Sequence, residues 1–180
     1  MLSNKKVAEN RLGGRFLVLL AAGCLTTFAQ QSTPASPFAV EAKKDYAAVK
    51  NNLLKAADAM PEEGYSFKAT SDVRTFGALV AHVAETQSWA CGTLLGSKSK
   101  PAKPGNTKVE AVAALKVAFS TCDSAYDSVT AENQLEIAGT GLLNRSRLAA
   151  LFLNNEHNNE TYGTMSVYLR LKGIVPPSSE

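Results

Sequence analysis

The sequence predicts an all-α protein, a four-helix bundle preceded by a signal peptide. Amphipathic stretches recur at helical spacing after the first thirty residues, and Pro, Gly and Ser separate them. Sustained alternation of apolar and polar residues, which is typical of strands, is missing from the same region. With 180 residues, of which 45% are hydrophobic, the chain is long enough to bury one core. We therefore expect one helical domain over residues 38–179.

Residues 1–29 have the charged and hydrophobic regions of a signal peptide. A basic stretch ending at Arg15 precedes the apolar residues 16–25, a run too short to span a bilayer as a mature helix. We expect cleavage after Ala29, with residues 30–37 serving as a linker and the mature protein periplasmic or secreted. Because residues 20–24 resemble a bacterial lipobox, a lipoprotein anchored at Cys24 is the alternative, and the only one that involves a membrane.

The formal net charge of +3 belongs to the export signal. Residues 1–29 hold four of the 19 basic and one of the 16 acidic residues, which leaves 15 of each in the rest of the chain. A neutral mature chain has no long-range attraction for DNA, RNA or anionic lipid. We therefore expect no nucleic-acid partner.

The first two helices are marked by residues that cap and end helices. Ser36 followed by proline predicts a helix over residues 37–60, which Pro61 ends. A second helix is predicted from about residue 74 to residue 95, ended by Gly96. The apolar residues expected to face the core from the first helix are Phe38, Val40, Tyr46, Val49, Leu53, Leu54 and Met60.

The third and fourth helices follow a Pro- and Lys-containing linker. Thr107 and Glu110 have capping-box spacing and open a helix that fades near Val129. Its expected apolar stripe consists of Val109, Val112, Leu115, Phe119, Cys122 and Tyr126. The fourth helix is predicted over residues 144–172 and ends at Gly173. Four such helices favour an antiparallel or a crossover-linked bundle.

Two cysteines remain once the export signal is set aside. Cys91 lies on the second predicted helix and Cys122 on the third. Export to an oxidising compartment favours a disulfide between them, closing a loop of about 30 residues. Two buried free thiols are the alternative interpretation.

The fourth helix contains eight consecutive polar residues, 154–161, between two apolar segments. Helical spacing places Asn155 and Asn158 on the apolar side, so at least two buried amides are expected to need partners. His157 falls on the neighbouring strip, and His82 lies in the middle of the second helix beside its apolar stripe. The two histidines are therefore expected to face each other.

A pair of histidines on facing helices is one way to begin a metal site, because neutral imidazole binds zinc, nickel and iron. Each histidine is followed three residues later by a carboxylate, Glu85 or Glu160, which lies on the same helix face. Two hydrogen-bonded core histidines are the alternative. No serine or cysteine lies in a recognisable nucleophile motif.

Several segments resemble the DinB family, the DinB/YfiT-like metalloenzymes, and the resemblance covers about residues 38–179. It is carried by residues 76–85, 89–92, 155–163 and, most specifically, 167–179. The resemblance implies a four-helix bundle that binds zinc or nickel through three histidines, one on the second helix and a His-x-x-x-His pair on the fourth. It also implies, for some members, thiol-dependent transfer chemistry.

Matched residue by residue, the resemblance makes His82 and His157 metal ligands and places the third ligand at Thr161, a poor ligand. Glu160 is the nearest charged substitute. One hypothesis is a metal-binding bundle with hydrolase or transferase activity. A second is a non-catalytic pseudo-enzyme that binds a small molecule in a polar pocket, to which Asn158 and Trp89 would also contribute. A structural module that works as a homodimer is a third.

Overall fold

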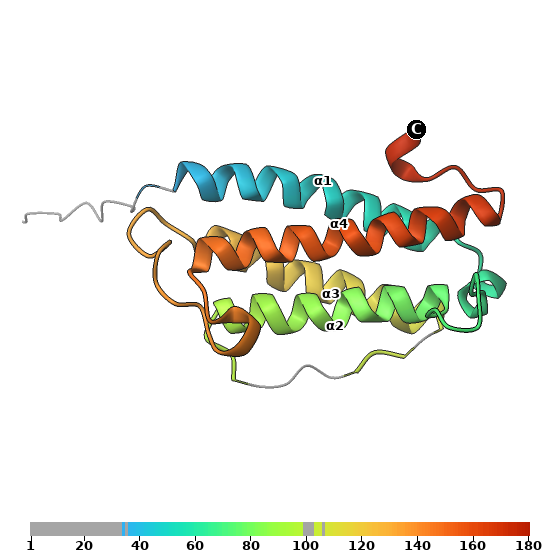
Figure 1. Ribbon diagram of the computed structural model, residues 1–180, viewed down its shortest axis with the longest axis horizontal. Helices are drawn as coiled ribbons and strands as arrows, with labels where there is room; N and C mark the ends of the chain where they lie inside the picture. The colour runs from blue at the N-terminus through green and yellow to red at the C-terminus, as the bar shows by residue number, and fades with distance from the viewer. Residues whose placement is uncertain (1–33, 35, 99–102, 106) are drawn as a thin grey trace, which may run out of the picture. The chain divides into compact units, whose positions relative to one another are not determined.

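Four α-helices form a bundle in the computed structural model, which describes residues 34, 36–98, 103–105 and 107–180 (Figure 1). The helices are α1 (Pro37–Ala59), α2 (Phe76–Leu94), α3 (Lys108–Asp127) and α4 (Arg147–Leu171), with short 3-10 helices η1 (Glu62–Ser66), η2 (Gly141–Leu143) and η3 (Pro177–Ser179). The described residues form no β-strand, and an isolated β-bridge joins Ile137 to Ser146. The all-α four-helix prediction is confirmed. The predicted signal peptide and Cys24 lie outside the described residues.

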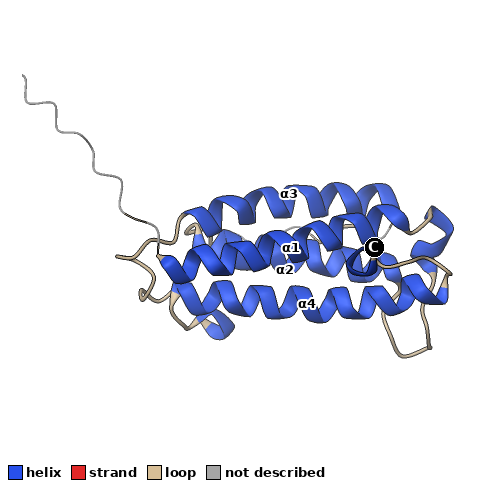
Figure 2. Ribbon diagram, turned by 90° about the horizontal axis from the view of Figure 1, so that it is seen from above, coloured by secondary structure: helices blue, strands red, loops and turns tan. Residues whose placement is uncertain are grey.

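The helices are arranged so that α1 and α2 each pack against both α3 and α4. Seen from above, α1 lies over α2, with α3 and α4 on either side (Figure 2). The chain runs one way along α1 and α4 and the opposite way along α2 and α3 (Figure 1). The crossover-linked alternative is therefore the correct one, because parallel α2 and α3 need the long connection between them. No helix in the described ranges is both long and apolar enough to cross a membrane.

Each α-helix begins with a hydroxyl side chain that accepts a hydrogen bond from the backbone amide three residues later. The capping residues are Ser36, Thr75, Thr107 and Ser146. These caps satisfy amide groups that have no partner inside the helix. Three predicted bounds differ from the observed ones by two or three residues, and one of them is the start of the second helix, at Phe76 and not near residue 74. The fourth helix starts at Arg147 and not at residue 144, because Ser146 is its cap, and the third ends at Asp127.

Three residues predicted to lie in the core are exposed. Phe38, Val40 and Val109 have exposed fractions of 65%, 40% and 77%. The cause is that alanines, not these larger side chains, continue the buried stripes into the first turns. The buried stripe of α1 includes Ala39 and Ala42, so Phe38 and Val40 are rotated towards solvent on either side of it.

A disulfide joins α2 to α3. It links Cys91 and Cys122, whose Cα atoms lie 5.0 Å apart and whose side chains are fully buried. Parallel neighbours bring the two residues level because each lies in the last third of its helix. The linkage fixes the spacing of α2 and α3 at the level of the polar segment of α4.

Candidate functional site

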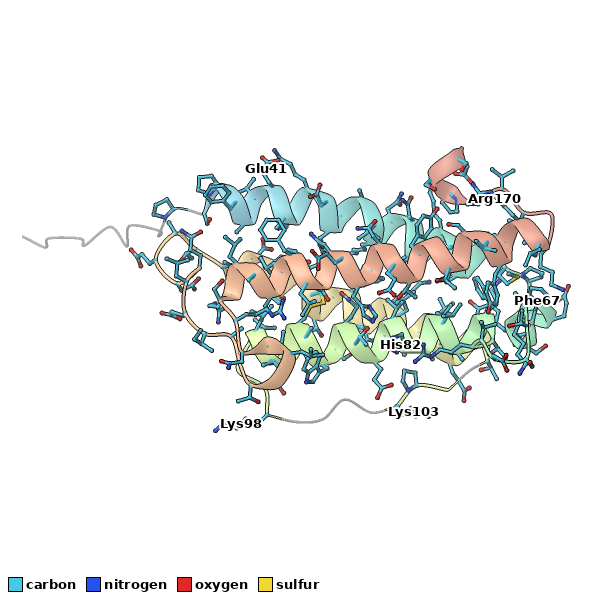
Figure 3. All side chains as sticks on the ribbon, viewed as in Figure 1. Glu41, Phe67, His82, Lys98, Lys103 and Arg170 are labelled. Carbon is cyan, nitrogen blue, oxygen red and sulfur yellow. A yellow bond between two sulfur atoms is a disulfide. The ribbon has the colours of Figure 1, made fainter. Side chains whose placement is uncertain are left out.

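The imidazoles of His82 and His157 meet between α2 and α4. Their Nε2 atoms lie 3.1 Å apart, and the ring centroids are separated by 5.0 Å. Figure 3 shows His82 in the first half of α2, and its partner lies near the middle of α4. The two helices run in opposite directions, so the polar segment of α4 lies opposite this part of α2. The expected meeting of the two histidines is present in the structure.

Both imidazoles are held in the neutral form. Burial is the main cause of the lowered pKa of His82 and of His157, because removing an imidazolium from water disfavours the charged form. The Arg74 guanidinium lowers both pKa values further, whereas Glu160 opposes the shift at both sites and Glu85 opposes it at His82. Neutral imidazole can coordinate a metal ion or share a hydrogen bond with its neighbour.

Thr161 lies one helical turn after His157 on α4, at the position where the sequence resemblance places a third ligand. This side chain is buried, and its hydroxyl donates a hydrogen bond to the backbone carbonyl of His157, with an oxygen-to-oxygen distance of 3.0 Å. Glu160 is exposed to solvent. Within the described ranges, no group of three or more His, Cys, Asp or Glu side chains is placed to hold a metal ion.

A buried amide network lies beside the histidine pair. The Gln87 side chain donates to the Oδ1 atoms of Asn154 and Asn158, both at 2.7 Å. The Asn154 amide donates in return to Gln87 and to the hydroxyl of Tyr126. That hydroxyl donates to Asn155, which itself donates to a carbonyl of α1. The polar segment of α4 is therefore hydrogen-bonded to all three other helices, and the prediction of buried asparagines on α4 is confirmed.

The sequence interpretation missed Gln87. The signal was present, since Gln87 continues the buried spacing of Val80, Val83, Cys91 and Leu94 along α2. A fully buried polar residue in an apolar stripe is a candidate partner for the amides of a neighbouring helix.

A cavity of about 250 Å³ opens beside the two imidazoles. Its lining includes His82, His157 and Trp89, as well as apolar side chains from η2 and α4. Trp89, which the sequence interpretation placed in a pocket, is 37% exposed at this cavity. Asn154 lines it in place of the predicted Asn158, which lies fully buried against Gln87.

The model of the DinB superfamily matches residues 45–165 of this sequence. That range covers the larger part of the chain and includes both histidines and Thr161. The chain belongs to the DinB superfamily. No curated protein sequence matches the chain significantly.

The spacing of the two histidines in this DinB protein fits a divalent ion. Zinc binds imidazole nitrogen at about 2.0–2.1 Å, so two nitrogens on a tetrahedral ion lie roughly 3.3 Å apart. The 3.1 Å between the Nε2 atoms of His82 and His157 is close to that spacing. Two imidazoles therefore fit, and the site has one strong donor fewer than the three-histidine set because a threonine, Thr161, stands at the third position.

The surroundings of the other ring nitrogen of His157 are less favourable for a histidine that binds a metal ion. Its Nδ1 atom is buried and has no hydrogen-bond partner. Metal-bound histidines normally donate this second N–H to an acceptor, which orients the ring. In the metal-free protein, the tautomer with the proton on Nε2 of His157 avoids an unpaired buried donor and lets His157 donate to His82. Metal binding at both Nε2 atoms would move that proton to Nδ1.

Proposed function

We propose that this DinB-superfamily protein is exported and holds a divalent ion, zinc or nickel, through His82 and His157. The observation that carries the proposal is the 3.1 Å approach of the two Nε2 atoms. Such an ion, when bound, acidifies a coordinated water or a thiol and polarises a carbonyl, as hydrolysis and thiol transfer require. Two protein ligands predict weaker binding than three would give.

The remaining residues support this role by position. Burial keeps both imidazoles neutral, so no proton has to be displaced from a charged ring before a metal ion binds. The Gln87 network fixes α4 on α2 next to His157, and therefore acts on the site through position alone. The adjoining cavity supplies space beside the histidines for a substrate.

Export is proposed on the sequence and on the cysteine pair together. A charged region, an apolar region and small residues follow one another at the start of the chain. The disulfide between Cys91 and Cys122 suits a protein that functions in an oxidising compartment. Soluble export after cleavage at Ala29 is our first choice, with anchoring at Cys24 as the alternative.

A second candidate function is a metal-free pseudo-enzyme that binds a small molecule. Two observations favour it. The Thr161 hydroxyl is hydrogen-bonded to its own helix, and the His157 Nδ1 atom lacks the acceptor that a metal-bound ring would use. In this case the histidine pair would be the polar wall of a ligand pocket.

Replacement of Thr161 separates the two candidates. Thr161→His restores the missing donor on the same face of α4 as His157. If the two existing histidines are a working pair, zinc or nickel affinity should rise by at least about tenfold, measured by competition with a chelating dye. Thr161→Val, which keeps the shape but adds no ligand, is the matched control. Equal metal affinity in both variants would contradict the metal proposal and favour the pseudo-enzyme.

A further inference from the structure

We infer that the cavity beside the histidine pair binds a small, uncharged molecule with one aromatic or alicyclic ring. The inference goes beyond metal binding and does not depend on it. The cavity lies between α2, η2 and α4, and its walls include Trp89, Leu142, Leu143 and Leu153. Four observations, on size, charge, free polar groups and the cavity mouth, support this class of ligand.

The size of the cavity limits the ligand. Its volume of about 250 Å³ is below the range of about 300–1,000 Å³ that is common for drug-sized ligands. A dry apolar cavity of about 150 Å³ is known to accept benzene. The space therefore suits one ring with a short substituent and is too small for a nucleotide or a peptide.

Charge also limits the ligand. The lining residues include no Asp, Glu, Lys or Arg. An anion or a cation would lose its hydration without gaining an opposite charge. A neutral molecule avoids this penalty.

Few polar atoms in the wall are available to a ligand. The Asn154 side chain is already bonded to Gln87 and Tyr126. The Thr86 hydroxyl donates to the backbone carbonyl of His82. The polar groups that remain in the lining are the two imidazoles and the indole N–H of Trp89, which suits a ligand with a single hydroxyl or carbonyl group next to its ring.

The rim of the cavity is apolar and well defined. Gly141, with φ at +60°, starts the turn that sends Leu143 into the core and leaves Leu142 67% exposed. A side chain at Gly139 would place its Cβ 2.7 Å from the Thr93 methyl, so this loop lies close against the end of α2. Trp89 and Leu142 therefore present apolar surface to solvent at a defined rim.

Trp89 is the only tryptophan of the chain, so its fluorescence reports directly on the cavity. Benzyl alcohol and benzoate share one ring and differ in charge, and each is titrated near neutral pH into the mature protein. We expect a saturable change with benzyl alcohol and binding of benzoate weaker by at least about tenfold. A response that does not saturate, or equal binding of the two probes, would overturn the inference.

Two phenylalanine variants on α4 locate the binding. Leu153→Phe fills the cavity and should weaken benzyl alcohol binding by at least about tenfold, whereas Val167→Phe adds the same ring at a site that is 53% exposed and should leave it unchanged. If Leu153→Phe fails to fold, Ala90→Val in the same wall takes its place. Unchanged binding in the cavity-filling variant would place the ligand elsewhere and reject the inference.

The titrations are run with zinc and, separately, with a chelator. Benzyl alcohol binding under both conditions is the expected result. Binding that requires zinc would contradict the inference as stated, because the cavity alone would then be insufficient. Benzyl alcohol binding in a protein that takes up no zinc would leave the inference standing and reject only the proposed metal function.

Discussion

The side-chain amides of Gln87 and Asn154 form a reciprocal pair across the α2–α4 interface. Gln87 donates to the Asn154 oxygen at 2.7 Å, and Asn154 donates to the Gln87 oxygen at 3.1 Å. Both residues are buried, so neither amide can exchange its partner for bulk water. This pair, together with Asn158, explains how a helix with eight consecutive polar residues packs into a bundle core.

Gln87→Met should destabilise the protein by about 1–3 kcal/mol, because it keeps most of the volume and leaves the buried oxygens of Asn154 and Asn158 without a donor. The free energy of unfolding in urea measures the effect. Asn51→Met, on the exposed surface of α1, is the control and should change stability by no more than about 0.5 kcal/mol. Equal stability of the two variants would show that the network contributes nothing net.

The disulfide should contribute measurably to stability. Cys91 and Cys122 are separated by 31 positions, and chain entropy for such a loop predicts a loss of roughly 3–4 kcal/mol when the bond is reduced. Urea unfolding with and without a reductant measures this loss. The double variant Cys91→Ala/Cys122→Ala should be insensitive to the reductant, and an equal response in that variant would mean that the effect does not come from this bond.

The helices could be located from sequence because their signals are local. Caps such as Thr75 and Thr107, and helix-ending glycines such as Gly96, act within one turn. The exposure of Val109 could not be foreseen from the spacing of large apolar residues, since the alanines set the buried stripe. The choice of crossover topology depends on contacts between helices that no single helix encodes.

The candidate site also combines features that can be predicted from the sequence with features that cannot. The facing of His82 and His157 follows from their strips on two amphipathic helices, and a sequence argument reaches it. The hydrogen bond of the Thr161 hydroxyl depends on one rotamer, and the unpaired Nδ1 of His157 depends on what packs behind the ring. Neither has a signature in residue spacing.

Stability of the metal-free protein should fall when the pH is lowered through the titration of the two histidines. An unfolded histidine has a pKa of about 6.5, and the folded pKa values of His82 and His157 are lower, mainly because of burial. Below about pH 6.5 the unfolded state therefore binds more protons, and the free energy of unfolding decreases until the folded pKa values are passed.

Urea unfolding in the presence of a chelator, at about pH 7.5 and about pH 5, measures this loss. In the double variant His82→Gln/His157→Gln, the part of the pH dependence due to these two residues should disappear. An unchanged pH dependence in the double variant would show that other groups are responsible.

Expression of the full chain in a bacterium should give a mature protein that begins at residue 30. Intact-mass measurement of the exported fraction identifies the cleavage site, and the Cys24→Ser variant should be processed identically. A product that begins at Cys24 with added lipid mass, lost in Cys24→Ser, would instead establish the lipoprotein alternative. Retention of residues 1–29 in the folded product would reject export.

The metal content of the mature chain, residues 30–180 without a histidine tag, tests the central claim most directly. After incubation with zinc or nickel and removal of loosely bound ions, elemental analysis should find about one ion per chain. His82→Ala and His157→Ala should each lose it while remaining folded. Less than about a tenth of an equivalent in the wild-type protein, or a metal content in the two variants equal to that of the wild type, would contradict a two-histidine metal site.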